Sequence, residues 1–187
     1  NRAETEWLHR ALERYQIPKK LVGRPTEKGP VPARLIPVFR DRDELPASAD
    51  LGNALHAGLE NSDHLIVIAS PASAGSVYVE EEIRYFKSLH GEQRVFALIV
   101  DGEPHASAMP GREAEEAFPR ALRYRIDGDA KISDIPAEPI AADIRKGKDG
   151  RRLALMKLVA GITGVDAGPP AGERLPLPRR EVRVHHL

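Results

Sequence analysis

Two nearly continuous apolar runs dominate the pattern of hydrophobic and polar positions along the chain. They cover residues 64–70 and 95–100, and neither shows the polar alternation of a half-exposed strand. Such runs are typical of strands that are buried on both faces of a parallel sheet. Between them, residues 76–86 carry apolar side chains at helical spacing. The pattern therefore predicts a strand–helix–strand unit, whose crossover should be right-handed.

The flanking segments extend this alternation of helices and strands. Three of them have apolar positions at helical spacing: 6–15, 51–59 and 151–163. Two short ones have the composition of strands: 35–39 and 121–126. Asp50 is placed to cap the second helix, and Gly164 to end the last one. The order of these elements predicts an α/β fold.

The two ends of the chain do not fit a complete α/β domain. Such folds normally begin with a strand, whereas this chain begins with a helix, so we expect the first strand to be missing. Residues 167–187 are rich in Pro and Arg and are expected to be a linker or tail, with His185 and His186 as a tag remnant. We therefore divide the chain into a domain over 1–166 and an appendage over 167–187.

The helix over 76–86 carries an acid among apolar side chains. At about 100° per residue, Glu82 falls in the middle of one arc with these residues: Tyr78, Val79, Ile83, Tyr85, Phe86 and Leu89. A carboxylate on an apolar face costs free energy unless something compensates it. Glu82 is therefore a candidate functional acid with a perturbed pKa. From periodicity alone, a surface acid beside a narrower apolar arc remains an equal alternative.

Composition narrows the function classes. Lys and Arg together number 28, as do Asp and Glu, so no basic excess points to nucleic acid. The chain has no Cys, which excludes disulfides and thiol catalysis. Its apolar runs are far shorter than the ~20 residues that span a bilayer. The His residues show no metal-ligand spacing. We expect a cytoplasmic protein with no membrane, nucleic-acid or metal partner.

Six segments in a fixed order resemble a bacterial Toll/interleukin-1 receptor (TIR) domain: 7–15, 34–45, 65–71, 78–83, 100–104 and 151–163. The chain is most similar to TIR modules that are fused to repeat or effector domains. The resemblance implies a flavodoxin-like fold, a five-stranded parallel sheet with helices on both faces. It also implies that the strand before Asn1 would complete part of a nucleotide pocket.

Many bacterial TIR domains cleave NAD⁺ at the nicotinamide–ribose bond, and the resemblance implies this activity here. The family pattern places an aromatic residue, usually Trp, four positions before a Glu; Tyr78 and Glu82 occupy these positions. Positions i and i+4 lie on one helix face, so the aromatic ring can line the pocket beside the carboxylate. By the same resemblance, further residues are expected at the pocket or its bordering loop: Phe39, Asp41, Leu45, Ser48 and Ser76. Ser76 is also placed to cap the helix.

A single carboxylate suits this chemistry. Loss of nicotinamide leaves an oxocarbenium-like ribose, whose positive charge a fixed carboxylate can stabilise. Nicotinamide is already a cationic leaving group in NAD⁺ and needs no general acid. The expected reaction therefore uses NAD⁺ as a substrate and requires neither a cofactor nor a metal.

Other interpretations remain open from the sequence. The domain could be a non-catalytic module that self-associates or binds other TIR domains through the loop over 42–50. It could also be a receiver-like or flavodoxin-like protein that binds a small ligand. Taken alone, Tyr78 is more easily explained as a core aromatic, and the charges over 40–44 as a solvated loop.

Overall fold

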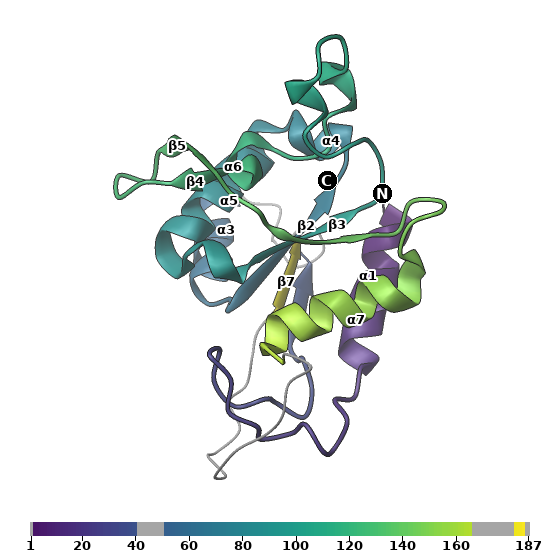
Figure 1. The fold of residues 1–187 in the computed structure, drawn as a ribbon. Coiled ribbons are helices and arrows are strands. Elements are labelled where there is room, and N and C mark those ends of the chain that lie inside the picture. Colours follow the sequence, from purple (N-terminus) through teal and green to yellow (C-terminus); the bar gives the residue numbers. More distant parts are fainter. Residues whose placement is uncertain (1, 41–50, 166–181, 186–187) are drawn as a thin grey trace.

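A parallel sheet between two layers of helices forms the centre of the molecule (Figure 1). The computed structural model describes residues 2–40, 51–165 and 182–185. The strands of the sheet, in spatial order, are β1 (Val38–Arg40), β7 (Val182–His185), β2 (His64–Ala69), β3 (Val95–Ile99) and β6 (Ile140–Asp143). If β7 is counted as a first strand, this is the 2-1-3-4-5 order of flavodoxin-like folds. The α/β expectation is confirmed.

The C-terminal segment supplies the strand that the sequence analysis found missing. β7 is parallel to both neighbours, with Arg183 in register between Phe39 of β1 and Leu65 of β2. Without it, β1 and β2 would each expose an unpaired backbone edge. The expectation of a linker or tail is therefore wrong for Val182–His185. Residues 166–181 and 186–187 lie outside the described part of the chain.

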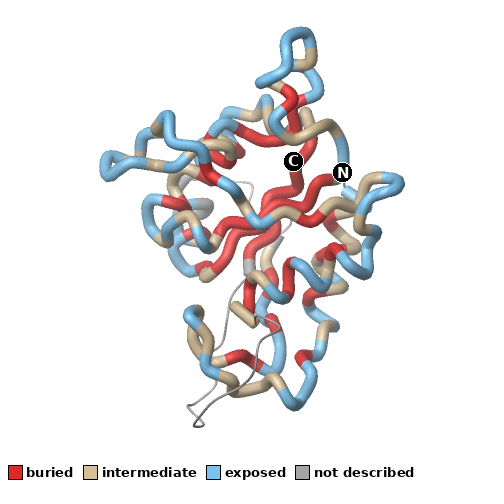
Figure 2. The backbone as a smooth tube through the Cα atoms, viewed as in Figure 1, coloured by how far each residue is buried: buried red, intermediate tan, exposed pale blue. Residues whose placement is uncertain are grey.

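The two faces of the sheet carry separate cores. On one face, α1 (Arg2–Arg14) and α7 (Gly150–Thr163) pack Leu8, Leu12 and Leu158 against alternate strand positions such as Ile66 and Leu98. On the other face, α3 (Leu51–Glu60) and α5 (Val77–His90) cover the remaining alternate positions. Figure 2 shows the central strands as continuously buried. Strands buried on both faces explain the unbroken apolar runs of β2 and β3.

The segment after β3 differs most from expectation. Its helices are short: η2 (Ala106–Ala108), η3 (Glu113–Glu115) and α6 (Arg120–Arg123). The strand expected over 121–126 is helical at first and becomes β4 only at Tyr124–Ile126. β4 pairs antiparallel with β5 (Ile132–Pro136) in a separate two-stranded sheet, so it is not an edge of the main sheet.

Most other elements agree with the sequence pattern. The helices expected over 6–15, 51–59 and 151–163 are α1, α3 and α7, and Gly164 ends α7 in a left-handed conformation. The first strand starts later than expected, at Val38, because Pro37 has no N–H for the ladder. The Asp50 cap lies outside the described residues.

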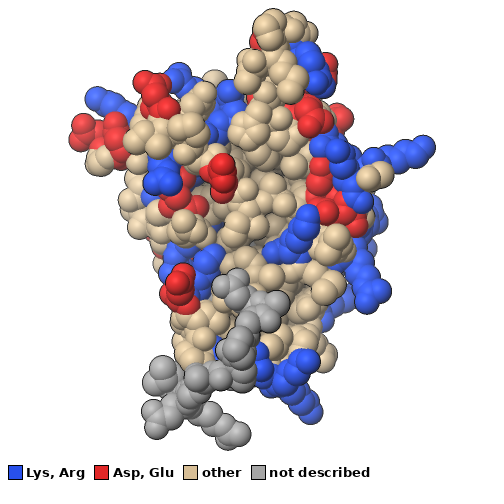
Figure 3. Space-filling model, viewed as in Figure 1, with Lys and Arg blue, Asp and Glu red and all other residues tan. Residues whose placement is uncertain are grey.

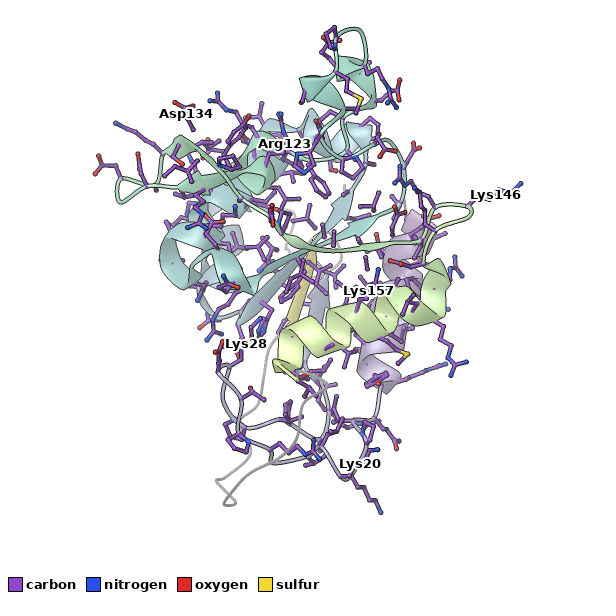
Figure 4. The ribbon with its side chains drawn as sticks, in the orientation of Figure 1. Lys20, Lys28, Arg123, Asp134, Lys146 and Lys157 are labelled. Atoms are coloured by element: carbon purple, nitrogen blue, oxygen red, sulfur yellow. The ribbon has the colours of Figure 1, made fainter. Side chains whose placement is uncertain are left out.

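Lys28 ties the long loop over 18–34 to the rest of the domain. Its Nζ donates hydrogen bonds to the Gly161 carbonyl at 2.7 Å and the Gln93 carbonyl at 2.9 Å. The ammonium also lies 4.7 Å from the centre of the Phe96 ring. Figure 4 shows Lys28 beside the end of α7. This loop is therefore anchored at the amino end of the sheet, away from the carboxyl ends of the strands.

Charges of both signs are mixed over the visible face of the molecule (Figure 3). This fits the equal numbers of acidic and basic residues in the chain. Among the described residues, no helix has both the length and the apolar character needed to cross a membrane.

Candidate functional site

The candidate site is built on α5, which follows β2 through the short helix α4 (Pro71–Ala74). Ser70 directly follows β2 and caps α4, and Ser76 then caps α5 by accepting a hydrogen bond from the Val79 N–H at 3.4 Å. The predicted capping role of Ser76 is confirmed. Its role in binding a nucleotide stays a prediction.

Three consecutive glutamates on α5 have three different environments. Glu80 faces α6, where its carboxylate accepts a hydrogen bond from the Ala121 N–H at 2.9 Å. Glu81 is exposed and forms an ion pair with Arg84 at 2.7 Å. Glu82 is only 6% exposed. The interpretation of Glu82 as a surface acid is therefore wrong, and it is the buried member of the run.

The buried arc of α5 is rotated relative to the predicted one. At about 100° per residue, the buried side chains run from Glu82 through Phe86 and Val79 to Ile83 and Lys87. Glu82 therefore lies at one edge of the buried arc and not in its middle. A residue at this edge can be covered by a neighbouring element while remaining close to the surface.

Tyr78 and Leu89 lie on the exposed side of Glu82. Tyr78 is 76% exposed and Leu89 is 47% exposed, so neither belongs to the core. The interpretation of Tyr78 as a core aromatic is wrong. The structure places it at the surface, one turn before Glu82, where its contact with a nucleotide stays a prediction.

A contact between α3 and α5 borders this edge. The Tyr85 hydroxyl donates a 2.5 Å hydrogen bond to Glu60, and His56 stacks on the Tyr85 ring with 4.2 Å between centres. The hydrogen bond to Glu60 is the main cause that raises the pKa of Tyr85. Tyr85 is three residues after Glu82, so this contact joins α3 to α5 within one helical turn of Glu82. The sequence pattern placed Tyr85 in the apolar arc but gave no sign of its partners.

The strand register puts Phe39 on the same face of the sheet as α5. Phe39 is half-buried and in register with Arg183 and Leu65, and Leu65 belongs to the core under α5. However, β2 continues for four more residues to Ala69, so Phe39 does not reach the carboxyl end of β2. The other predicted pocket residues, Asp41, Leu45 and Ser48, lie outside the described residues.

Arg183 lies on the same face of the sheet as Phe39 and Leu65, and the sequence pattern did not mark it as a buried charged residue. Its side chain is buried and points toward α3, where a Cβ on Gly58 would lie 1.8 Å from the Arg183 Nη1. Glycine at position 58 therefore makes room for the guanidinium. The alternation Val182-Arg183-Val184 was the available signal for a strand, but the prolines before it favoured a tail.

Within the described residues, no group of three or more His, Asp or Glu could hold a metal ion. The expectation that the chemistry needs no metal or cofactor stays a prediction. The arrangement itself offers a buried carboxylate on a capped helix, near the surface and beside an exposed aromatic ring.

Comparison with known proteins agrees with this architecture. Residues 32–131 match the family model for the TIR domain. A curated relative, the NAD(+) hydrolase ApTIR of Actinoplanes sp. (strain ATCC 31044 / CBS 674.73 / SE50/110), is 29% identical over 156 residues. That match covers 81% of this chain and 21% of the relative, so the chain spans about a fifth of that protein. No solved structure matches the chain.

The family match includes β1, β2, β3 and the whole of α5, and it covers more than half of the chain. The chain therefore belongs to the TIR domain family.

Proposed function

We propose that this TIR domain hydrolyses NAD⁺ at the bond between nicotinamide and ribose, with Glu82 as the essential carboxylate. The observation that carries the proposal is the burial of Glu82 at the family's position, next to two acids that have ordinary structural or surface roles. The relative named as an NAD(+) hydrolase supports the choice of substrate.

In this mechanism the Glu82 carboxylate stabilises the positive charge that develops on the ribose as the C1′–N bond breaks. Nicotinamide leaves as a neutral molecule, because the bonding electrons return to its ring nitrogen. Water then attacks C1′ and releases a proton, which gives ADP-ribose. Tyr78, exposed one turn earlier on α5, would lie against the bound nucleotide.

Nicotinamide release from NAD⁺ by the 187-residue chain tests the proposal, measured by chromatography over a range of protein concentrations. The chain should release nicotinamide, and Glu82→Gln should reduce the rate by at least about a hundredfold, as loss of one charge-stabilising group does elsewhere. Glu81→Gln is the matched control, since it changes the adjacent acid. Equal rates for wild type and Glu82→Gln would overturn the role of Glu82.

A second candidate function is TIR–TIR association. It is favoured by two adjacent exposed side chains at the start of α5, Val77 at 72% and Tyr78 at 76% exposure. Exposed apolar side chains that adjoin one another suit a contact with another protein. Light scattering of Val77→Asp, compared with Glu81→Gln, tests this role; self-association that is equal in the two variants would count against it. The two functions are compatible, because self-association could order the pocket.

A further inference from the structure

A cavity of about 380 Å³ lies at the amino edge of the sheet. Val95 and Ile140, the first residues of β3 and β6, form part of its wall. Its other lining residues come from the last turns of α5, the 3-10 helix η1 (Glu92–Arg94), β4, the end of β5 and the segment before β6: Lys87, Glu92, Gln93, Arg125, Pro136, Ala137, Glu138 and Pro139. The cavity is at the low end of the size range for small-molecule sites.

Lys87 provides a buried positive charge in this wall. Its side chain is almost completely buried, and its Nζ lies 2.5 Å from a Glu92 oxygen and donates to the Tyr124 carbonyl at 3.1 Å. A lysine ammonium has three N–H donors. Among the described residues only Glu92 and Tyr124 bind it, so one of its three N–H donors is left for a further acceptor.

Glu92 is held in place by the protein. The carboxylate oxygen that does not pair with Lys87 accepts a hydrogen bond from the Ile126 N–H at 2.9 Å. Both oxygens are therefore engaged, and Glu92 fixes the position of the Lys87 ammonium. A ligand would meet an ammonium whose orientation is already set, which reduces the entropy cost of binding.

Arg125 adds a second positive group. It is exposed on β4, and within the described residues its guanidinium has no hydrogen-bond or ion-pair partner. Burial is the main cause that lowers the pKa of Lys87; Glu92 and Glu80 oppose it, and the nearby positive charge of Arg125 adds a smaller lowering effect. Two cations that repel each other across a cavity favour an anion between them. The rest of the wall includes the apolar side chains of Pro136, Pro139 and Ile140.

We propose that this cavity is a binding site for a small organic anion. Its carboxylate or phosphate group lies between Lys87 and Arg125, and its apolar part lies against Pro136, Pro139 and Ile140. The site is separate from Glu82 and does not depend on the proposed NAD⁺ chemistry, although both sites share α5.

The test is a titration of the 187-residue chain with phenyl phosphate and with benzoate, followed by backbone amide NMR. These probes separate a phosphate ligand from a carboxylate one, and benzyl alcohol is the neutral control. The amides of Val95, Ile126 and Ala137 should shift and saturate for at least one anion. A dissociation constant on the order of 1 mM is ordinary for a ligand of this size.

Arg125→Ala should weaken binding by roughly tenfold, the value of one charge-assisted hydrogen bond. Lys131→Ala is the matched control, because Lys131 is exposed on the same hairpin and does not line the cavity. Lys87→Met should abolish binding, provided that its amide spectrum shows a folded protein. Arg125→Ala avoids this condition, because Arg125 is exposed and can be replaced without disturbing the core. Failure of both anions to saturate, equal shifts with benzyl alcohol, or equal weakening by Arg125→Ala and Lys131→Ala would each overturn the proposal.

Discussion

Glu82 and Glu116 are buried to the same extent, with 6% of each residue exposed, yet their surroundings differ. Glu116 lies in the irregular segment between β3 and α6. Glu82 lies on a regular helix, among apolar neighbours that pack on the sheet. The comparison shows that burial of an acid does not by itself indicate chemistry; the hydrogen bonds around the carboxylate must be considered as well.

The contacts of Glu116 account for its burial in structural terms. Its carboxylate accepts hydrogen bonds from the N–H groups of His105, Ser107 and Phe118, and from the Ser107 hydroxyl at 2.6 Å. Arg123 of α6, labelled in Figure 4, donates to the same Ser107 hydroxyl at 2.6 Å. A loop without regular backbone pairing needs such an acceptor for its N–H groups. Glu116 therefore organises the loop.

Glu82 lies on α5, a helix that pairs its own backbone and is capped by Ser76. If Glu82 serves chemistry and Glu116 serves the fold, removing each charge should affect different properties. The largest expected effect is on activity: Glu82→Gln should lower the rate of nicotinamide release by at least about a hundredfold, equivalent to roughly 3 kcal/mol. Its thermal midpoint should stay close to wild type, since glutamine has nearly the same size. A large loss of stability in Glu82→Gln would instead assign this residue to the fold.

The reverse result is expected for Glu116→Gln. Removing the charge weakens several charge-assisted hydrogen bonds, so the free energy of unfolding should fall by roughly 3 kcal/mol. Nicotinamide release per folded molecule should be unchanged. Urea denaturation followed by fluorescence of Trp7 measures the first quantity, and the chromatographic assay measures the second.

The pH dependence of Glu116 provides an independent check. Burial alone would raise the pKa of Glu116, but hydrogen bonds from Ser107 and Phe118 outweigh it and hold the pKa below the ordinary 4.5. The unfolded chain therefore takes up this proton at a higher pH than the folded one. The stabilisation is complete above pH 4.5 and is lost as pH falls below it. The difference in unfolding free energy between wild type and Glu116→Gln should thus narrow from pH 7 to pH 3; a constant difference would contradict this account.

The two acids also show what a sequence pattern can reveal. Glu82 was found because it interrupts the helical periodicity of α5, and its burial is confirmed. The exact rotation of the helix was not predictable, because the elements packed around α5 decide which of its edges is buried, and these are distant in the sequence. Glu116 lies in a segment without periodicity, so no pattern marked it as buried.

The strands of the sheet also show that a local sequence pattern predicts some elements and misses others. The continuous apolar runs correctly predicted β2 and β3, whereas β6 and β7 were missed. β6 is only four residues long, and two of these are alanines. β7 follows a proline-rich segment, and its place between β1 and β2 depends on pairing with residues more than a hundred positions away. Local composition carries no information about such partners.

Lys87 is a third buried charged residue to compare with Glu82 and Glu116, and it differs from them in forming an ion pair, with Glu92. Glu92→Gln keeps an acceptor for the Ile126 N–H but leaves the Lys87 ammonium without its carboxylate. We expect this variant to lose roughly 2 kcal/mol of stability, somewhat less than a fully buried pair because Glu92 is partly exposed. The double variant Lys87→Met/Glu92→Gln should recover most of that loss in urea denaturation. If the double variant is less stable than Glu92→Gln, the ammonium contributes to stability apart from its pairing with Glu92.

The smallest effect is expected at Glu81, the exposed neighbour of Glu82. Its ion pair with Arg84 is at the surface, where such pairs contribute at most about 0.5 kcal/mol. Glu81→Gln should therefore leave both the unfolding free energy and the rate of nicotinamide release near their wild-type values. The same two measurements apply, and salt should reduce whatever small difference in stability remains. Residues 81 and 82 carry the same side chain on the same helix, so the two variants remove the same charge. A similar loss of activity in both would show that activity depends on the net charge of α5. It would contradict a specific role for the buried carboxylate of Glu82.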